Sequence, residues 1–580
     1  TGDAYVDHPS FGASIITRVL QAKGFKVAVL SQPDWKSTAD FEQFGKPRLA
    51  YFITSGNIDS MVAHYTVAKR PRSQDAYTAG GAMGKRPDRA VIVYSNIVKR
   101  LFPDVPVVIG GLEASLRRFA HYDYWDDSVR PSILLDSKAD LLIYGMGENQ
   151  SIQIAERLAS GEKIDTMHDI KGTVYSVDVR ETPYVGVECP SFENVSSSKK
   201  EYAKAARVQQ DEQDHIRGKV IKQKHGKKMV VQNQPMPPLT TPELDWVYSL
   251  PYARAYHPMY ESMGGVPGIQ EVEFSITHNR GCFGACNFCS IQFHQGRYIT
   301  TRSKKSIMAE AEKLTHLPNF KGYIHDIGGP TANFRRTSCD FQLEHGLCKG
   351  KKCLAPKPCP NLAVDHSEYL DILRSVRELP GVKKVFIRSG IRYDYLLEDK
   401  DDSFFRELSK RYFQYTGEVN KEQYLVPYLM SSHPGSTLDD AIELAEFLKK
   451  NHIRPEQVQD FYPTPGTIST TMYYTGLDPY TMQEVYCAKN PHDKALQRAL
   501  LQYFNPKNAA LVEEALRRAH RYDLIGTGEK CLVRGQTQNN KKQRSTANGK
   551  KYPHGNSSGL NNKNRNKNHK KGSSNRGRKR

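Results

Sequence analysis

The chain has 580 residues, of which 38% are hydrophobic and 25% are charged, and its formal net charge is +20. A chain of this length is too long to fold around one hydrophobic core, so we expect two to four domains. Because no run of 18 or more apolar residues and no charged-then-apolar leader occurs, we expect a cytoplasmic protein without a membrane partner.

The positive charge is concentrated at the C-terminal end. Residues 536–580 contain fourteen Lys and Arg and no Asp or Glu, which leaves a net charge of +6 for the first 535 residues. This tail is rich in Asn, Gly and Ser and has almost nothing apolar to bury, so we expect it to be disordered. A block of like charge serves either as a solubilising tail or as a nonspecific contact for RNA, and both interpretations stay open.

The first 165 residues alternate strand-like and helical patterns, which is typical of a doubly wound parallel sheet. The expected elements are a helix at 11–23 and strands at 26–30, 48–54, 90–94, 105–109 and 140–144. Glycines at 110–111, 145 and 147 follow two of these strands, at the strand ends where such sheets bind ligands. No strand precedes the opening residues, so we expect that the first strand of the sheet is missing from this sequence.

Residues 166–265 show a weaker pattern, which predicts a linker or insertion. The stretch 196–228 is polar and includes an exposed helix, and the Pro-rich stretch from Met236 is typical of a linker. The aromatic segment 243–260 is expected either to cover the mouth of the following domain or to pack in a core.

Residues 266–475 predict a run of βα units with short connections, as in a partial TIM-like barrel. The expected strands are 274–277, 321–330, 383–389, 423–429 and 457–463, and the expected helices are 304–317, 365–378, 403–413 and 437–450. Residues 476–535 predict helices that close this core.

Three closely spaced cysteines lie near the start of that domain. Cys282, Cys286 and Cys289 follow the spacing C-x3-C-x2-C on a glycine-containing loop. Four thiolates normally hold a tetrahedral zinc or an iron–sulfur cluster, so three leave one position for another ligand, as in a catalytic site. The alternatives are a zinc loop completed by His278 or His294, incidental thiols, or a disulfide, which a reducing compartment disfavours.

The motif resembles the signature of the radical S-adenosylmethionine (SAM) superfamily, C-x3-C-x-aromatic-C, with Phe288 as the aromatic residue. The resemblance implies a 4Fe-4S cluster on the three cysteines. SAM would bind the fourth iron, and one electron from a reductant such as flavodoxin or ferredoxin would cleave it to methionine and a 5'-deoxyadenosyl radical. Gly328 and Gly329 resemble the superfamily's Gly-Gly-Glu motif and would meet the SAM amino group, although Pro330 replaces the usual acidic residue.

The flanking sequences narrow the resemblance. The stretches at 243–260, 294–303, 423–448 and 457–470 are similar to the YgiQ-type radical SAM proteins, a bacterial family without an assigned reaction, and the likeness runs from about residue 1 to 535. It implies a cobalamin-binding-like N-terminal domain. The cobalamin-ligating pattern Asp-x-His-x-x-Gly is absent, however, since Asp7 and His8 only approach it, which favours a loop role for His8.

The barrel pattern is one unit short. Where the family carries a further strand and helix between Phe413 and Gln423, only QYTGEVNKE stands, and five strands are expected instead of six. This predicts a protein that binds its cluster but cleaves SAM poorly. A noncatalytic iron–sulfur or RNA-associated protein with a degenerate barrel remains the alternative.

Two further groups of residues are candidates for the site. Cys339, Cys348, Cys353 and Cys359 lie in an insertion at 335–362 and predict either a second metal site, an auxiliary iron–sulfur cluster ahead of zinc, or a loop of reduced thiols. Residues near strand ends are expected to contact SAM or substrate, or else to make structural hydrogen bonds: Arg388, Arg392, His433 and Tyr462. The sequence assigns neither a catalytic residue nor a substrate.

Overall fold

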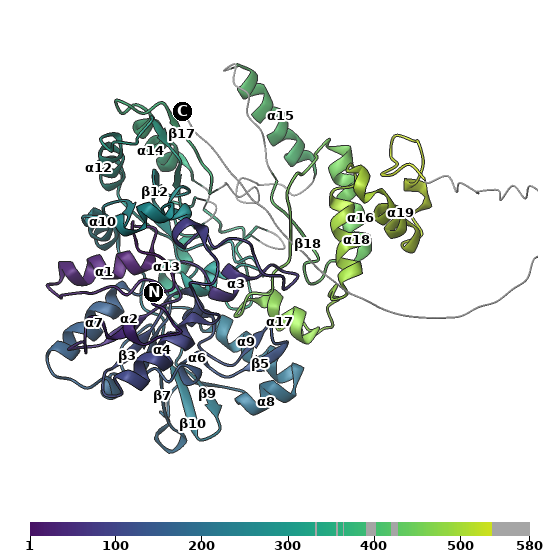
Figure 1. The fold of residues 1–580 in the computed structure, drawn as a ribbon. Coiled ribbons are helices and arrows are strands. Elements are labelled where there is room, and N and C mark those ends of the chain that lie inside the picture. The colour runs from purple at the N-terminus through teal and green to yellow at the C-terminus, as the bar shows by residue number, and fades with distance from the viewer. Residues whose placement is uncertain (331–332, 355–357, 364, 390–401, 419–426, 536–580) are drawn as a thin grey trace, which may run out of the picture. The chain divides into compact units, whose positions relative to one another are not determined.

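A seven-stranded mixed sheet organises the N-terminal half of the chain (Figure 1). The computed structural model describes residues 1–330, 333–354, 358–363, 365–389, 402–418 and 427–535, with the side chains of 402–408 and 415 excepted. In sheet order the strands are β2 (Tyr51–Ile53), β3 (Val107–Ile109), β6 (Leu141–Ile143), β7 (Thr173–Asp178), β10 (Lys228–Gln232), β9 (Ile221–His225) and β8 (Val187–Cys189).

This sheet confirms the predicted α/β class but corrects the prediction of an all-parallel sheet. Strands β2, β3 and β6 form a parallel run, β7, β10 and β9 continue it in antiparallel pairing, and β8 pairs parallel with β9 at the other edge. Four of the strands come from 173–232, within the range expected to be a linker or insertion. Residues 1–535 form one compact unit, so the expected boundary at residue 165 falls between neighbouring strands of a continuous sheet.

Two expected strands are wrong. Residues 90–94 begin helix α4 (Ala90–Leu101), whose buried positions recur with helical spacing and place Val91, Tyr94 and Val98 on one face. Residues 26–30 form no strand and follow the helix that ends at Ala22 as irregular chain. Short β-branched runs fit either conformation, and tertiary packing decides between them.

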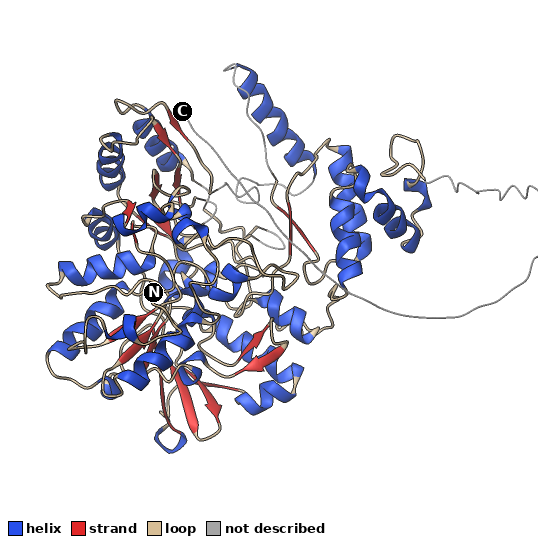
Figure 2. Cartoon of the chain, in the orientation of Figure 1, coloured by secondary structure: helices blue, strands red, loops and turns tan. Residues whose placement is uncertain are grey.

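Helices cover the sheet and supply its connections (Figure 2). The expected helix at 11–23 is confirmed as α1 (Gly12–Ala22), which packs on α7. The other helices of this part that bear on the site are α3 (Ser60–His64), α5 (Gly111–Leu116), α7 (Glu148–Ala159), α8 (Phe192–Ser197), α9 (Lys199–Asp211) and α10 (Thr241–Ser249).

The following part of the chain contains parallel strand pairs. Strand β12 (Ser275–Thr277) pairs with β16 (Asp326–Gly328), β15 (Tyr323–Ile324) with β17 (Lys384–Val385), and β18 (Leu429–Ser431) with β19 (Val458–Asp460). The helices between them are α12 (Lys304–Thr315), α14 (Ser367–Arg377), α15 (Asp402–Glu418) and α16 (Leu438–Lys450). This is the expected order of βα units. Residues 419–426 and Arg392 lie outside the described chain, so closure of the barrel and the missing unit stay predictions.

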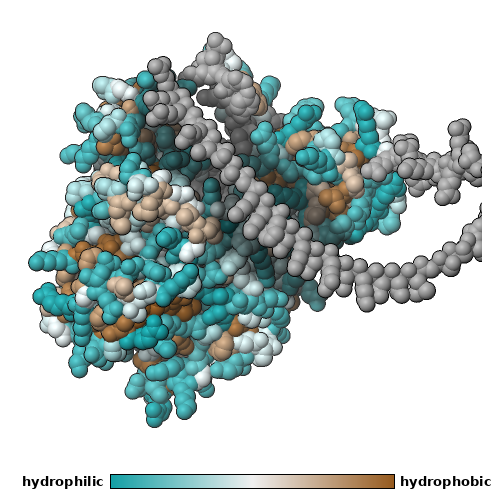
Figure 3. All heavy atoms as spheres, in the orientation of Figure 1, coloured by the Kyte–Doolittle hydropathy of each residue, from teal (hydrophilic) through white to brown (hydrophobic). Residues whose placement is uncertain are grey.

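The C-terminal part of the first unit is helical, as expected. It comprises α17 (Ile468–Thr475), α18 (Pro491–Leu501) and α19 (Ala509–Arg518), and α18 and α19 share an apolar core with α16. Among the described residues, no helix has both the length and the apolar character needed to cross a bilayer. Hydrophilic residues cover most of the face seen in Figure 3, with apolar side chains in small groups between them. The expected disordered tail, 536–580, is not part of the described chain.

Candidate functional site

The three motif cysteines lie on a loop whose two ends are held together. Strand β13 (Asn279–Arg280) enters the loop and pairs antiparallel with β14 (Thr300–Thr301), which leaves it. We call the intervening residues 281–299 the cluster loop. Cys282 is 6% exposed, whereas Cys286 and Cys289 are half-buried. The pairing brings all three thiols into one short closed segment.

Backbone conformation within the cluster loop depends on Gly281. Its φ is +82°, and a Cβ added there would lie 1.7 Å from the Tyr298 carbonyl oxygen, so only glycine fits. The Cys282 amide donates to the Gly296 carbonyl at 3.1 Å, and the Cys289 amide donates to the Cys286 carbonyl at 3.1 Å. These contacts fix the backbone around the thiols without using the thiols themselves.

The N-terminal sheet anchors the cluster loop. Buried Arg280 donates to buried Glu148, the first residue of α7, at 2.6 Å. Helix α11 (Ile291–His294), within the loop, packs on α5, and His294 Nδ1 lies 3.0 Å from Ser115 Oγ. A Cβ at Gly145 would lie 3.2 Å from the His294 carbonyl oxygen. The glycine at the end of β6 thus provides room for the cluster loop.

Gly328 and Gly329 lie directly beside the start of the cluster loop. In the β12–β16 pair Thr277 is opposite Gly328, and the His278 amide donates to the Gly328 carbonyl at 2.9 Å. A Cβ at Gly329 would lie 1.8 Å from Asn279 Oδ1, so the missing side chain is what admits this asparagine. The structure therefore brings the predicted glycines next to the predicted cysteine loop.

Asn279 is the unexpected member of this group. It is 1% exposed, and neither its Oδ1 nor its Nδ2 has a hydrogen-bond partner among the described residues. A buried amide without partners costs free energy, so such a group is expected to meet a ligand. One amide offers a donor and an acceptor, which match the carboxylate and ammonium of an amino acid. Three thiols, two glycines and this amide are the kinds of group that a cluster with an adjoining SAM would need, although the described structure does not gather the three thiols in a metal-binding arrangement.

The histidines considered as zinc ligands are engaged elsewhere. His278 Nε2 lies 3.1 Å from Asn333 Oδ1, and burial followed by Arg335 lowers the pKa of His278 to about 3. His294 contacts Ser115 as described above. Within the described residues, no group of three or more His, Cys, Asp or Glu side chains has a metal-binding arrangement. This holds for the three motif thiols as well, so the zinc loop stays an alternative prediction beside the cluster.

The Cys-rich insertion packs against the cluster loop. Cys353 and Leu354 share an apolar cluster with Cys282 and Phe283. Lys352 Nζ donates to Asn287 Oδ1, which ties the insertion to the segment between the second and third motif cysteines. Of the four insertion cysteines, Cys348 is exposed and the others are half-buried. A second metal site in the insertion stays a prediction.

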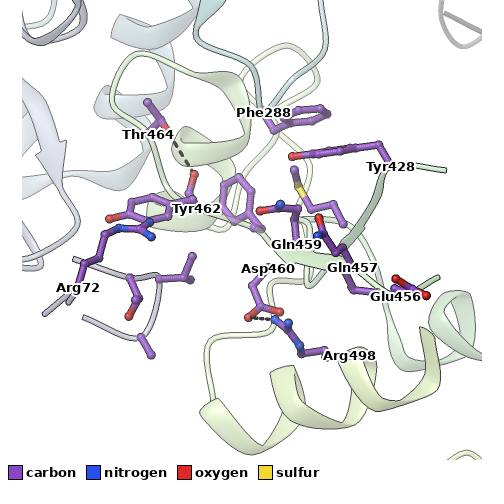
Figure 4. A pocket seen from close by; sticks show the side chains of 16 residues that line it. Arg72, Phe288, Tyr428, Glu456, Gln457, Gln459, Asp460, Tyr462, Thr464 and Arg498 are labelled. Carbon is purple, nitrogen blue, oxygen red and sulfur yellow. Dashed lines mark hydrogen bonds and ion pairs between the residues drawn. The ribbon is translucent and has the colours of Figure 1, made fainter. Parts of the chain in front are cut away.

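A cavity of about 550 Å³ has Phe288, the residue before the third motif cysteine, in its lining (Figure 4). Its lining combines the loop after α3, the cluster loop and strands β18 and β19: Thr66, Val67, Ala68, Arg72, Phe288, Tyr428, Met430, Glu456, Gln457, Val458, Gln459, Asp460, Phe461, Tyr462, Thr464 and Arg498. Tyr428, which is 68% exposed, lines the cavity together with Phe288. Asp460 pairs with Arg498 at 2.6 Å. The cavity is thus aromatic near the cluster loop and polar farther away.

The other residues predicted to contact SAM or substrate lie in different surroundings. Tyr462 lines the cavity and donates to the Tyr65 carbonyl at 3.1 Å. The His433 ring lies 6.0 Å from that of Phe288 and its Nε2 lies 2.7 Å from Ser469 Oγ. Arg388 is exposed and pairs with Glu271.

Sequence reasoning missed Asn279, Arg72 and Tyr428. For Asn279 the available signal was its position directly before the cysteine motif. Nothing in the sequence distinguishes Arg72, because apart from residues 66–68 its cavity partners lie more than 200 residues away along the chain.

Comparisons with known proteins place these features in a wider group. Residues 1–275 match the family described as radical SAM N-terminal, and residues 456–580 match a domain of unknown function, DUF3362. A UPF0313 protein of Clostridium botulinum (strain 657 / Type Ba4) is 55% identical over 569 residues, covering 92% of this chain and 89% of the relative. A UPF0313 protein of Clostridium perfringens (strain 13 / Type A) is 53% identical over 570 residues, covering 92% and 86%.

Two solved structures of one enzyme are more distantly similar. Both are of TsrM from Kitasatospora setae, a radical S-adenosylmethionine methyltransferase. The structure with tryptophan substrate and a SAM analogue is 15% identical with a TM-score of 0.40, covering 80% of this chain and 72% of that one. The structure with cobalamin and a [4Fe-4S] cluster is 13% identical with a TM-score of 0.41, covering 89% and 97%.

Proposed function

Because the chain belongs to the UPF0313 family of radical SAM proteins, we propose that Cys282, Cys286 and Cys289 hold a 4Fe-4S cluster at which SAM is reductively cleaved. Such a cluster, when bound, supplies the single electron that converts SAM to methionine and a 5'-deoxyadenosyl radical. Membership in this family favours the enzymatic interpretation over a noncatalytic iron–sulfur or RNA-associated protein.

The observation that carries the proposal is the buried amide of Asn279 beside Gly329, which has no hydrogen-bond partner in the part of the chain that the structure describes. Its Nδ2 would donate to the SAM carboxylate and its Oδ1 would accept from the SAM ammonium. Gly328 and Gly329 lack side chains, so the backbone at the end of β16 can approach the same groups. These residues orient SAM beside the thiols.

The cavity at Phe288 provides the place for a substrate. Phe288 and Tyr428 place two aromatic rings on the cavity wall next to the cluster loop. Hydrogen abstraction from an unactivated carbon requires the substrate carbon to lie close to the SAM 5' carbon, and the cavity is the candidate place because Phe288, the residue before the third motif cysteine, lines it. The identity of the substrate is a separate question.

The test is anaerobic reconstitution with iron and sulfide, reduction with dithionite, and measurement of 5'-deoxyadenosine with and without fractions of cell extract. Cys286→Ala should abolish 5'-deoxyadenosine formation, whereas Cys531→Ala, at a half-buried cysteine outside the motif, should leave it intact. Equal 5'-deoxyadenosine formation by both variants would refute the proposal. Poor turnover by the wild type with a full cluster would support the predicted shortened barrel.

Iron analysis of the same samples addresses the insertion cysteines. Near four irons per chain indicates one 4Fe-4S cluster, and near eight indicates that the insertion holds a second cluster. The iron content of Cys348→Ser is compared with that of the wild type, because Cys348 is the exposed one of the four insertion cysteines.

A further inference from the structure

Four lysines from separate parts of the chain converge on one group of packed tyrosines. We call Lys69, Lys199, Lys489 and Lys494 the lysine cluster. Each ammonium lies over a tyrosine ring: Lys199 Nζ is 3.0 Å from the centroid of Tyr474, Lys69 Nζ is 4.7 Å from Tyr124, and the Nζ atoms of Lys489 and Lys494 are 5.3 and 5.2 Å from Tyr473.

The tyrosines join these ammonium groups into one surface. Tyr122 stacks on Tyr474 with centroids 4.5 Å apart, and Tyr124 meets Tyr473 edge-on at 6.0 Å. All four tyrosines are buried, so their ring positions are fixed by packing. Cation–π contacts hold each lysine near its ring. The four charges are therefore positioned together by a rigid base.

Among the described residues, the lysine cluster has no carboxylate as an ion-pair partner, although Asp127 and Asp460 lie near enough to act on Lys199 and Lys494. Within the described chain, Lys199, Lys489 and Lys494 form no ion pair with a carboxylate, and Lys69 donates to the Trp125 carbonyl. The two nearby acids are already engaged, since Asp127 accepts from Tyr122 at 2.5 Å and Asp460 pairs with Arg498. Four like charges held this way repel one another, and an anionic ligand would offset that cost.

The pKa values of two of the lysines are lowered, as expected for positive charges held close together. Burial and then Lys489 lower the pKa of Lys199 to about 8, with Asp127 opposing the shift. Burial also lowers the pKa of Lys494, where Asp460 opposes and Lys69 and Lys489 add to the shift. A bound anion would raise both pKa values.

The lysine cluster adjoins the cavity at the cluster loop. Ala68 lines the cavity next to Lys69, and Arg498 lines it one helical turn after Lys494 on α18. Phe461, also in the lining, lies 6.0 Å from Tyr473. An extended anion on the lysines could therefore continue into the cavity and reach Phe288.

We propose that the lysine cluster and this cavity bind single-stranded nucleic acid, with phosphates on the lysines and one base in the cavity. The cavity offers aromatic rings for stacking at Phe288 and Tyr428 and side-chain amides for base edges at Gln457 and Gln459. A base must leave its stack before an enzyme can act on it, which favours a single strand. The inference rests on the proposed function, because it names the substrate class for the same site.

The test compares two triple variants in the full-length chain. Lys199→Gln/Lys489→Gln/Lys494→Gln removes charge from the lysine cluster, and Lys305→Gln/Lys321→Gln/Lys383→Gln removes equal charge from exposed positions elsewhere. Residues 536–580 contribute the same fourteen basic residues to both. Binding of fluorescent single-stranded RNA and DNA 12-mers is measured by anisotropy at several salt concentrations, and iron content and thermal melting check the fold.

The cluster variant should bind at least tenfold more weakly than the control variant. Each lost phosphate contact lowers the salt slope by about 0.7 for a single strand, so three lost contacts should lower it by about 2. Oligonucleotides carrying a 4-thio base should crosslink to the peptide containing Tyr428 or residues 456–464. Binding of RNA, of DNA or of both fits the proposal, and the comparison tells which of them the site prefers.

Three results would overturn the inference: equal affinity and slope in the two triple variants, crosslinks confined to residues 536–580, or displacement by a poly-glutamate peptide as effective as by unlabelled oligonucleotide. The last would assign the surface to an acidic protein instead. The samples without cell extract contain no nucleic acid, so formation of 5'-deoxyadenosine in them by a protein that fails these tests would leave the proposed function standing. Its absence from a protein that passes them would refute only the proposed function.

Discussion

The guanidinium of Arg280 lies 2.6 Å from the carboxylate of Glu148, and this buried ion pair ties the cluster loop to the N-terminal sheet. Arg280 stands two residues before the first motif cysteine, and Glu148 begins the helix that follows β6. The N-terminal domain therefore contributes to the site by holding the loop in position, whatever else it binds.

Glu148→Gln should loosen iron binding. Removing one partner of a buried ion pair leaves an uncompensated charge, which costs about 3–5 kcal/mol. We expect the reconstituted variant to lose iron to a chelator severalfold faster than the wild type. Glu162→Gln, in the more exposed pair with Arg157, is the matched control and should behave as the wild type. Equal rates of iron loss in both variants would show that the sheet does not support the loop.

Gly281→Ala should abolish cluster binding through sterics. Alanine at a φ of +82° costs about 1–2 kcal/mol in any setting, and here its Cβ would also meet the Tyr298 carbonyl at 1.7 Å. Gly24→Ala separates the cost of the positive φ from the cost of the clash, because Gly24 has a φ of +87° and nothing lies within 4 Å of an added Cβ. We expect Gly24→Ala to lower the melting temperature slightly and keep its iron, and Gly281→Ala to lose its iron. Full iron content in Gly281→Ala would contradict this account of the loop.

Asn279→Ala should weaken SAM binding while leaving the cluster in place. A hydrogen bond to a charged group contributes about 1.5–3 kcal/mol, so loss of the amide predicts a Kd for SAM about 10- to 100-fold higher. Equilibrium dialysis with labelled SAM and iron analysis on the same sample measure the two properties separately. Asn194→Ala, at an exposed site on α8, is the control. An unchanged Kd for SAM would remove Asn279 from the site.

Gly329→Ala should share this phenotype, because its Cβ would lie 1.8 Å from Asn279 Oδ1 and displace the amide. We expect normal iron content and weaker SAM binding. Loss of iron instead would mean that Gly329 serves the cluster loop rather than SAM.

The sequence predicts local features well and long-range assembly poorly. The cysteine motif and the glycine pair can be recognised from the sequence because each motif spans only a few consecutive residues. The amphipathic helices α12, α14 and α16 can be predicted from the periodicity of their own apolar residues. Strand β9 was missed because its sequence IKQKH is polar, and it is held by pairing with β8 and β10 rather than by its own apolar pattern. The lysine cluster joins residues 69 and 494, a proximity that only the fold creates.

Acid should destabilise the protein through His278. This ring is fully buried, accepts at Nδ1 from Arg335 at 3.5 Å and donates at Nε2 to Asn333, so a second proton would face a guanidinium. Arg302 adds to the repulsion, whereas Glu368 is engaged with Arg335. The folded-state pKa is lowered to about 3, so between about pH 6.5 and pH 3 the unfolded state binds the extra proton and stability falls as pH falls.

The expected loss from this one group is about 2 kcal/mol on going from pH 7.5 to pH 5. It is measured as the fall in melting temperature of protein prepared without iron, since acid also attacks clusters. His278→Gln cannot gain the proton, so its melting temperature should fall less over the same range, even if the variant is less stable at pH 7.5. His316→Gln, at an exposed histidine on the edge of α12, should follow the wild type. An equal pH dependence in wild type and His278→Gln would mean that other buried groups control the acid response.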